Sequence, residues 1–320
     1  MLTDEQLHYL RGTKGKETPY RAIASTTGLS TDSIRGRVSR YRRQLLAENE
    51  GLKRENQRLR AELDARDDVF GNDLGKAWEL AGDWIIAGDV HANTINREFM
   101  MRPLEIAERY LERPRRFLLA GDFFNADAFS DYDNLYPLPS FKTELQAARA
   151  FLELYQQVFD EVWIIPGNHD YRVTKKTGTA IQMEDLIRMV SHDPRIHVSH
   201  WGHAVIKTAR GDYRVTHGSD FSVQQLNVAD QLALKYDQHI IGWHQHHCAI
   251  GLSRWKRHIV IDGGGLFDQS SMAYTQIEDN KKPMMANGFV LLRNGYPYVF
   301  NDMWTDWSFW LDKAARKVAA

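Results

Sequence analysis

The residues best suited to chemistry in this sequence stand where apolar segments end. The stretch "EVWIIPGNHDY" (161–171) runs an apolar strand directly into Asn168, His169 and Asp170. A buried polar group without a partner is destabilising by a few kcal/mol, so a core has no use for three of them in a row. The pattern therefore predicts that a partner at this strand end satisfies these side chains.

The same event recurs at four other apolar segments. "DWIIAGDVHAN" supplies Asp89 and His91, "RFLLAGDFFN" supplies Asp122 and Asn125, "YRVTHGSD" supplies His217, and "HIIGWHQHH" supplies His244, His246 and His247. Helical stretches, 141–160 and 179–192 among them, lie between these segments. The alternation predicts an α/β architecture in which the polar side chains meet at the carboxyl ends of the strands.

The donor types in this set indicate a metal centre. Carboxylate, amide oxygen and imidazole suit Mn, Fe or Zn, whereas a structural zinc would favour thiolates. The chain has one cysteine, Cys248, so it has no internal disulfide framework. If seven donors serve two ions, one carboxylate must be shared, and such an ion pair can clamp a phosphoryl group.

Five blocks in order resemble the motif series of the calcineurin-like metallophosphoesterases: "GDVHAN", "GDFFN", "GNHD", "HG" and "GWHQH". The resemblance covers about residues 83–300. It implies a four-layer sandwich, in which two mixed sheets are flanked by helices, and hydrolysis of a phosphoester by two divalent ions, with Mn expected and Fe or Zn as alternatives.

The resemblance also implies which residues hold each ion. One site would use Asp89, His91, Asp122 and His246; the other would use Asp122, Asn168, His217 and His244. Asp122 would bridge the two ions. His169 would protonate the leaving-group oxygen during in-line attack on phosphorus.

Three departures from the family pattern bear on the substrate. Trp243 interrupts the usual Gly-His-x-His block, which leaves open a register that uses His247. Asn125-Ala126 stands where many phosphatases of the family have Asp then Arg, so the carboxylate that orients the catalytic histidine and a phosphate-binding arginine are both missing. This favours a phosphodiesterase over a protein phosphatase. "DGGG" (262–265) replaces a Pro-Gly-Ser turn and would still let backbone approach the substrate.

Several segments around the centre have two interpretations each. Asn125 and the basic loop 171–182, with Arg172, Lys175 and Lys176, are candidate substrate contacts, or the loop is simply solvated. Aromatic residues of the insertion 125–140 would stack bases or pack on the body: Phe129, Tyr132 and Tyr136. The Trp-rich tail 303–313 is expected to seal the core or a subunit contact. The histidines outside the five blocks are expected to be structural: His192, His197, His200, His203, His239 and His258.

The N-terminal segment has a different charge from the rest of the chain. Residues 1–60 carry 13 basic and 7 acidic side chains, whereas the remainder is net acidic. Thr18-Pro19 and Ser30 are helix-start signals, and Gly28 is a stop signal. The stretch 18–44 resembles a helix-turn-helix whose second helix displays five arginines toward DNA: Arg35, Arg37, Arg40, Arg42 and Arg43. A helical hairpin with a solvated basic face is the alternative.

A heptad follows the basic helix without a stop signal. Leu45, Leu52 and Leu59 recur every seven residues, with Asn49 and Asn56 at the other seam position. Leu at d and buried Asn at a favour a parallel two-stranded coiled coil. The pattern predicts a homodimer, with a higher oligomer left open, that presents two recognition helices to two half-sites.

These features predict four regions: a helix-turn-helix domain over 1–44, a coiled coil over 45–66, a linker over 67–82 and a metallophosphoesterase domain over 83–320. We expect a cytoplasmic nuclease or nickase, brought to DNA by its N-terminal arm, with no membrane partner; this architecture would fit a phage or mobile-element protein. The alternatives are a phosphomonoesterase or small-molecule phosphodiesterase whose arm only serves assembly, and a DNA-binding regulator with a vestigial metal site.

Overall fold

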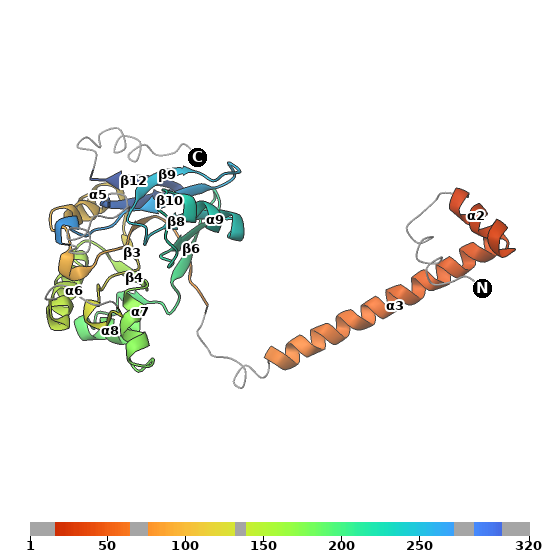
Figure 1. Ribbon diagram of the computed structural model, residues 1–320, viewed down its shortest axis with the longest axis horizontal. Coiled ribbons are helices and arrows are strands. Elements are labelled where there is room, and N and C mark those ends of the chain that lie inside the picture. The colour runs from red at the N-terminus through yellow and green to blue at the C-terminus, as the bar shows by residue number, and fades with distance from the viewer. Residues whose placement is uncertain (1–16, 65–75, 132–138, 272–284, 303–320) are drawn as a thin grey trace. The chain divides into compact units, whose positions relative to one another are not determined.

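The computed structural model describes residues 17–64, 76–131, 139–271 and 285–302. The chain divides into two compact units, Met1–Asp73 and Leu74–Ala320, which are described separately. The helical arm forms part of the first unit, and the second is a two-sheet body (Figure 1).

The arm contains two helices joined by a tight turn. Helix α2 (Glu17–Thr27) ends where Gly28 adopts φ +69°, and α3 (Thr31–Asp64) then runs without a break. Ile34 and Val38 are buried against Tyr20, Ile23, Ala24 and Leu29. The predicted pair of helices is present, and the second helix continues through the heptad region as expected.

One sheet of the body, here called sheet B, is mainly parallel. It contains β2 (Trp84–Ala87), β3 (Arg116–Ala120), β4 (Glu161–Ile165) and β5 (Ile196–Val198) as parallel neighbours, with β11 (Gly288–Arg293) and β12 (Tyr296–Asn301) added antiparallel beside β2. The strands alternate with helices, as the apolar segments of the sequence predict.

The other sheet, sheet A, is mixed. Its order is β1 (Glu79–Ala81), β6 (His203–Lys207), β7 (Tyr213–Thr216), β8 (His239–Gly242), β10 (Ile259–Gly263) and β9 (Cys248–Leu252). Strands β7, β8 and β10 are parallel, whereas β9 is antiparallel to β10. This second sheet supplies the strand ends that precede His217 and His244.

Successive side chains of a strand point to opposite faces of its sheet, so each sheet can pack against the other sheet on one face and against helices on the other. Ile86 and Leu118 of sheet B face Ile206, Val215 and Ile241 of sheet A across a buried core. The alternate residues of sheet B pack on the other face, against α5 (Arg102–Tyr110), α6 (Phe141–Tyr155) and α8 (Met183–Val190). Helix α9 (Asn227–Tyr236) covers the outer face of sheet A. The body is therefore the predicted sandwich of two mixed sheets flanked by helices.

Four expected segments differ in extent or type from those observed. The helices expected over 141–160 and 179–192 span Phe141–Tyr155 and Met183–Val190. Strand β1 lies inside the expected linker 67–82 and pairs with β6, so the body begins before residue 83. The basic segment after His169 is not a loop at its start: α7 spans Asp170–Lys176. Among the described residues, no helix is both long and apolar enough to cross a bilayer.

Candidate metal centre

Five strand ends bring the polar donors to one edge of the sandwich. Strands β2, β3 and β4 are parallel in sheet B, and β7 and β8 are parallel in sheet A, so within each sheet their carboxyl ends point the same way. The residues that follow these ends are Asp89, His91, Asp122, Asn168, His217, His244 and His246. Each donor is thus fixed by a strand rather than by a long loop.

The backbone turns sharply at most of these positions. The left-handed region, which side chains with a Cβ seldom occupy, is adopted at Asp89 (φ 47°), His91 (φ 44°), Asp122 (φ 49°), His244 (φ 76°) and His246 (φ 57°). Neighbouring glycines make room for the donors: a Cβ at Gly121 would collide with the ring of His217, and one at Gly167 with the carboxylate of Asp122. Strained backbone of this kind is characteristic of functional sites.

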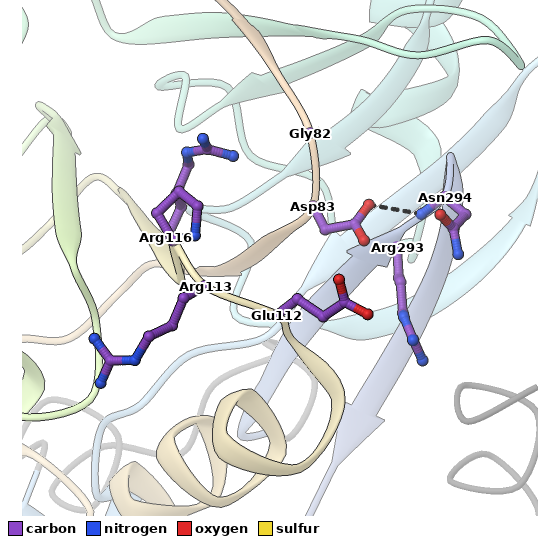
Figure 2. Close-up of a pocket in the computed structure, with 8 residues that line it drawn as sticks. Gly82, Asp83, Glu112, Arg113, Arg116, Arg293 and Asn294 are labelled. Carbon is purple, nitrogen blue, oxygen red and sulfur yellow. Dashed lines mark hydrogen bonds between the residues drawn. The ribbon is translucent and has the colours of Figure 1, made fainter. Parts of the chain in front are cut away.

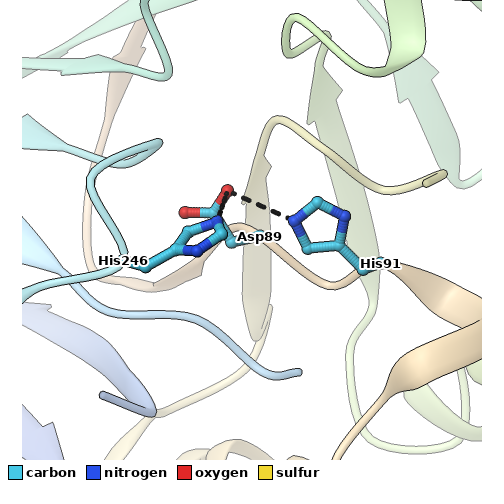
Figure 3. Close-up of side chains that lie close together, drawn as sticks. All are labelled: Asp89, His91 and His246. Carbon is cyan, nitrogen blue, oxygen red and sulfur yellow. Dashed lines mark ion pairs between the residues drawn. The ribbon is translucent and has the colours of Figure 1, made fainter. Parts of the chain in front are cut away.

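One group of donors surrounds Asp89 (Figure 3). Its Oδ1 lies 3.4 Å from Nε2 of His246 and 3.8 Å from Nε2 of His91, and its Oδ2 accepts the backbone N–H of His244 at 2.9 Å. One ligand atom from each of Asp89, His91 and His246 falls within 4.8 Å of the others. This spacing suits a single cation among the three.

A second group surrounds Asp122. Its Oδ2 lies 3.2 Å from Nε2 of His217, which is also 3.0 Å from Oδ1 of Asp89. His244 completes this group, and a further set joins Asp122 with His91 and His169. Asp122 therefore belongs to two sets of potential ligands, and His91 links one of them to the group around Asp89.

Burial and mutual charge set the protonation of the donors. Burial lowers the pKa of His91 to about 3 and that of His244 to about 4, so both rings are neutral at physiological pH. Burial alone would raise the pKa of Asp122, yet the nearby His217 and His169 lower it well below its usual range. His91, His244 and Asp122 therefore present two neutral imidazoles and a carboxylate, the forms that bind cations.

Three buried atoms in the centre that could bind a metal have no hydrogen-bond partner: Nε2 of His91, Oδ2 of Asp122 and Oδ1 of Asn168. Unsatisfied buried polar atoms are uncommon in native structures, and each calls for an unseen partner. Nδ1 of His91 lies 3.0 Å from Oδ1 of Asn125, which turns Nε2 toward Asp89. Oxygen and imidazole donors left open in this way fit divalent metal ions.

His169 lies at the edge of the centre, and the partner of its ring Nδ1 is a backbone carbonyl rather than a carboxylate. Its backbone N–H donates to Oδ1 of Asp122 at 2.8 Å, and its Nδ1 donates to the carbonyl of Asn125 at 2.9 Å. Nη2 of Arg172 lies 3.1 Å from Nε2 of His169. The family's arginine after the second strand end is missing, and the first turn of α7 places Arg172, a candidate substrate contact, beside the candidate acid.

Two acidic residues that the sequence analysis did not assign support the loops. Oδ1 and Oδ2 of Asp170 accept the backbone N–H groups of Phe124 and Gly167 at 2.9 and 2.8 Å, which ties the second strand end to the third. Glu144 on α6 accepts the backbone N–H groups of Asn125 and Ala126. The position of Asp170 beside His169 was a usable signal, whereas nothing in the sequence linked Glu144 to residue 125.

Trp243 and the glycine run are two parts of one packing arrangement. The indole is buried and lies so close to Gly263 that a Cβ there would collide with it. Gly263 therefore accommodates the indole of Trp243, which gives this glycine of the run a packing role. His247 is buried 3.6 Å from Asp262 and belongs to none of the ligand groups, whereas His244 and His246 do.

The remaining candidates lie outside the centre. Lys175 is exposed, and Lys176 pairs with Asp131. Phe129 packs on Phe141 in the helical layer, with ring centroids 5.0 Å apart. The ring of His197 packs against Trp163, and no described ligand group contains a histidine from outside the five blocks. Tyr132, Tyr136 and the tail 303–313 fall outside the described residues.

A separate pocket of about 430 Å³ opens at the opposite edge of sheet B (Figure 2). Its walls come from the start of β2, the start of β3 and the end of β11. Asp83 there accepts the backbone N–H of Asn294, while Arg113 and Arg116 pair with Asp160 and Glu161. Asp83, Arg113 and Arg116 of this lining therefore already have protein partners.

The chain is similar to a known protein family and to several solved structures. A family model described as calcineurin-like phosphoesterase matches residues 84–283. Vps29 from Chaetomium thermophilum shares 11% identity at a TM-score of 0.38, covering 70% of this chain and 96% of that one. Hypothetical protein PH1004 from Pyrococcus horikoshii OT3 shares 9% identity at a TM-score of 0.39, covering 69% and 88%. Zn-complexed Vps29 from Entamoeba histolytica shares 14% at 0.34, covering 68% and 97%. No curated protein matches.

Proposed function

Because the chain belongs to the calcineurin-like phosphoesterase family, we propose that it is a two-metal phosphodiesterase that cleaves nucleic acid. The observation that carries the proposal is the convergence of donors around Asp122, which is shared by two ligand groups. Asp89, His91, Asp122 and His246 would hold one ion, and Asp122, Asn168, His217 and His244 the other. Bound divalent ions supply charge stabilisation for phosphoryl transfer.

The protein residues around the ions would bind and orient the substrate. His169, kept in place by the carbonyl of Asn125, faces the centre through Nε2 and would deliver a proton to the leaving-group oxygen. Arg172 offers a guanidinium next to that atom, and a guanidinium fork pairs well with phosphoryl oxygens. Lys175 and Lys176 in the last turn of α7 would attract flanking phosphates of a polynucleotide.

The arm supports a nucleic-acid substrate rather than a small ester. Ile34 and Val38 fix α3 against α2, and Arg35, Arg40 and Arg43 are exposed on α3. We propose that Arg37 and Arg42, which are half-buried, join them at a DNA surface, and that the heptad residues pair two chains. Two arms would then place two basic helices on one duplex.

The activity is tested by incubating the protein and Mn with supercoiled plasmid. We expect nicking by the native protein and a loss of about 10²–10⁴-fold in rate for His169→Ala, because general acid catalysis contributes about that much. His200→Ala, which removes an exposed imidazole, should leave the rate unchanged. Survival of both plasmid and bis-p-nitrophenyl phosphate, with Mn bound and no ester cleaved, would instead favour a regulator with a vestigial centre.

A phosphomonoesterase is the second candidate, and Arg172 is the observation that favours it. The chain lacks the usual Asp-Arg pair after the second strand end, but the guanidinium of Arg172 could hold the second negative charge of a monoester. Cleavage of p-nitrophenyl phosphate, with bis-p-nitrophenyl phosphate left intact, would select this reading.

DNA binding by the arm is tested through its salt dependence. We expect Arg35→Gln/Arg40→Gln/Arg43→Gln to reduce the slope of log K against log salt by about 3, since each phosphate contact contributes about 0.9. The triple variant Lys53→Gln/Arg54→Gln/Arg58→Gln removes equal charge farther along α3 and should bind with the native slope. Equal loss in both variants would mean that the contact is not local to the predicted recognition helix.

A further inference from the structure

Asp127 contacts, through its carboxylate, two residues beside the metal centre, Arg172 and Asn125. It begins a short 3₁₀ turn, Asp127–Phe129, that follows the second strand end. Its side chain is 28% exposed, and each of its oxygens has a different polar partner. Oδ1 lies 3.1 Å from Nη1 of Arg172, and Oδ2 accepts Nδ2–H of Asn125 at 2.5 Å.

Arg172, the first partner of Asp127, also contacts His169, the candidate acid. Nη1 of Arg172 donates to both Asp127 and the carbonyl of Asn125, and the latter contact is 2.9 Å long. This leaves Nη2 directed at Nε2 of His169, 3.1 Å away. The Arg172 side chain is 20% exposed. Its guanidinium therefore has one nitrogen anchored and the other beside the atom that faces the centre.

Asn125, the second partner of Asp127, also contacts His91, a candidate metal ligand. Because Nδ2 of Asn125 donates to Asp127, the amide is oriented with Oδ1 toward Nδ1 of His91. That contact directs Nε2 of His91 at Asp89 and the centre. Groups that fix a ligating histidine from its far nitrogen tune metal affinity. Asp127 acts on His91 only through Asn125.

We infer that Asp127 is a positioning residue that holds Arg172 as the ligand of a phosphoryl oxyanion and, through Asn125, orients His91 for metal binding. The inference rests on the proposed function in that it assigns the same centre. The carboxylate that the family pattern places at residue 125 is here supplied two residues later. It acts through an arginine and an amide rather than directly on the histidine.

The proposed role of Arg172 in phosphate binding is tested by calorimetry, with inorganic phosphate titrated into the Mn-loaded protein. Arg172→Ala should weaken phosphate binding about tenfold or more, because a charged hydrogen bond is lost. Arg172→Lys should recover only part of it, since an ammonium cannot contact Asp127 and the ligand as a fork does. Free guanidinium should strengthen phosphate binding by the Arg172→Ala variant and should leave phosphate binding by the native protein unchanged.

A double-mutant cycle separates positioning from general structural damage. Asp127→Ala should weaken phosphate binding in the native background and have no further effect in the Arg172→Ala background, because its influence passes through that arginine. Its effect on Mn affinity, expected to be about tenfold, should persist in both backgrounds, because that influence passes through Asn125.

Asp193→Ala is the matched control. Asp193 has a similar exposed fraction, 26%, and likewise pairs with an arginine, Arg195, but stands outside the centre. It should change neither phosphate nor Mn affinity. Full additivity of Asp127→Ala and Arg172→Ala on phosphate binding, or an Asp193→Ala effect of equal size, would overturn the inference.

The outcomes distinguish this inference from the proposed function. If plasmid DNA stays intact while phosphate binding depends on Arg172 and Asp127 as described, the nuclease proposal fails and the inference stands. If plasmid is nicked in a His169-dependent manner while phosphate binding ignores both residues, the inference fails and the nuclease proposal stands.

Discussion

Nε2 of His217 lies 3.2 Å from Oδ2 of Asp122, and both side chains are buried. Burial alone would lower the pKa of His217, yet Asp122 and Asp89 raise it well above its ordinary value. In the metal-free protein this ring therefore carries a proton between two carboxylates. A metal ion that binds His217 must displace that proton.

We expect Mn binding to release protons and to strengthen as pH rises toward the raised pKa of His217. Each proton displaced changes affinity by up to about tenfold per pH unit. Calorimetric titrations at pH 6.5 in two buffers of different ionisation enthalpy measure the release directly. His91, whose pKa burial has lowered to about 3, should contribute none. Identical heats in both buffers would contradict the prediction.

The shared carboxylate predicts a pattern of metal stoichiometry. His246→Ala and His244→Ala each remove a donor from one of the two ligand groups, so each variant should retain one Mn per chain. Asp122→Ala removes the carboxylate that we propose is shared by both ions, so this variant should retain less than one. Elemental analysis after dialysis against micromolar Mn gives the three values. Retention of two ions by Asp122→Ala would disprove the bridging role.

The leucine stripe of α3 predicts the oligomeric state. Leu52 and Leu59 are 64% and 44% exposed in the single chain, although the heptad predicts that they are buried between two helices. Leu52→Ala/Leu59→Ala should shift the protein from dimer to monomer at micromolar concentration, as read by light scattering. Leu46→Ala removes a 62% exposed leucine that is off the seam and should remain dimeric. A monomeric native protein would refute the coiled coil.

Glu144 predicts a pH dependence of stability. Burial raises its pKa from 4.5 to about 7, so between these values the native state binds more protons than the unfolded chain. The free energy of unfolding should therefore fall as pH rises from 5 to 7, by up to about 1.4 kcal/mol per pH unit from this group. Glu144→Gln should show a smaller fall in urea unfolding with EDTA present. Glu153→Gln, exposed on the same helix, should match the native slope.

The sequence predicted an α/β architecture with polar side chains at strand ends because both have local signatures, whereas the two-sheet sandwich was implied by the resemblance of the five blocks to a known family. Apolar runs that end on Asp, Asn or His mark strand ends, and such ends meet where parallel strands finish. The same locality explains the helix punctuation around Gly28, where φ is +69° as a C-terminal glycine requires. These features depend on neighbours in the chain, so one sequence is sufficient to find them.

The contacts that the sequence did not reveal join residues that are far apart in the chain. Arg172 reaches the carbonyl of Asn125 across 47 positions, and Glu144 reaches the same loop from α6. The pairing of Trp243 with Gly263 likewise depends on how β8 and β10 lie together. The start of the body was misplaced because β1 is only three residues long, too short for a periodic signal.

Five candidate ligands occupy left-handed backbone conformations that glycine adopts more easily: Asp89, His91, Asp122, His244 and His246. Replacing any of these residues with glycine relieves an unfavourable conformation while it destroys a donor. A lineage that no longer needed the chemistry would thus gain robustness by abandoning it, one corner at a time. Keeping aspartate or histidine at all five corners therefore costs backbone energy that glycine would not cost.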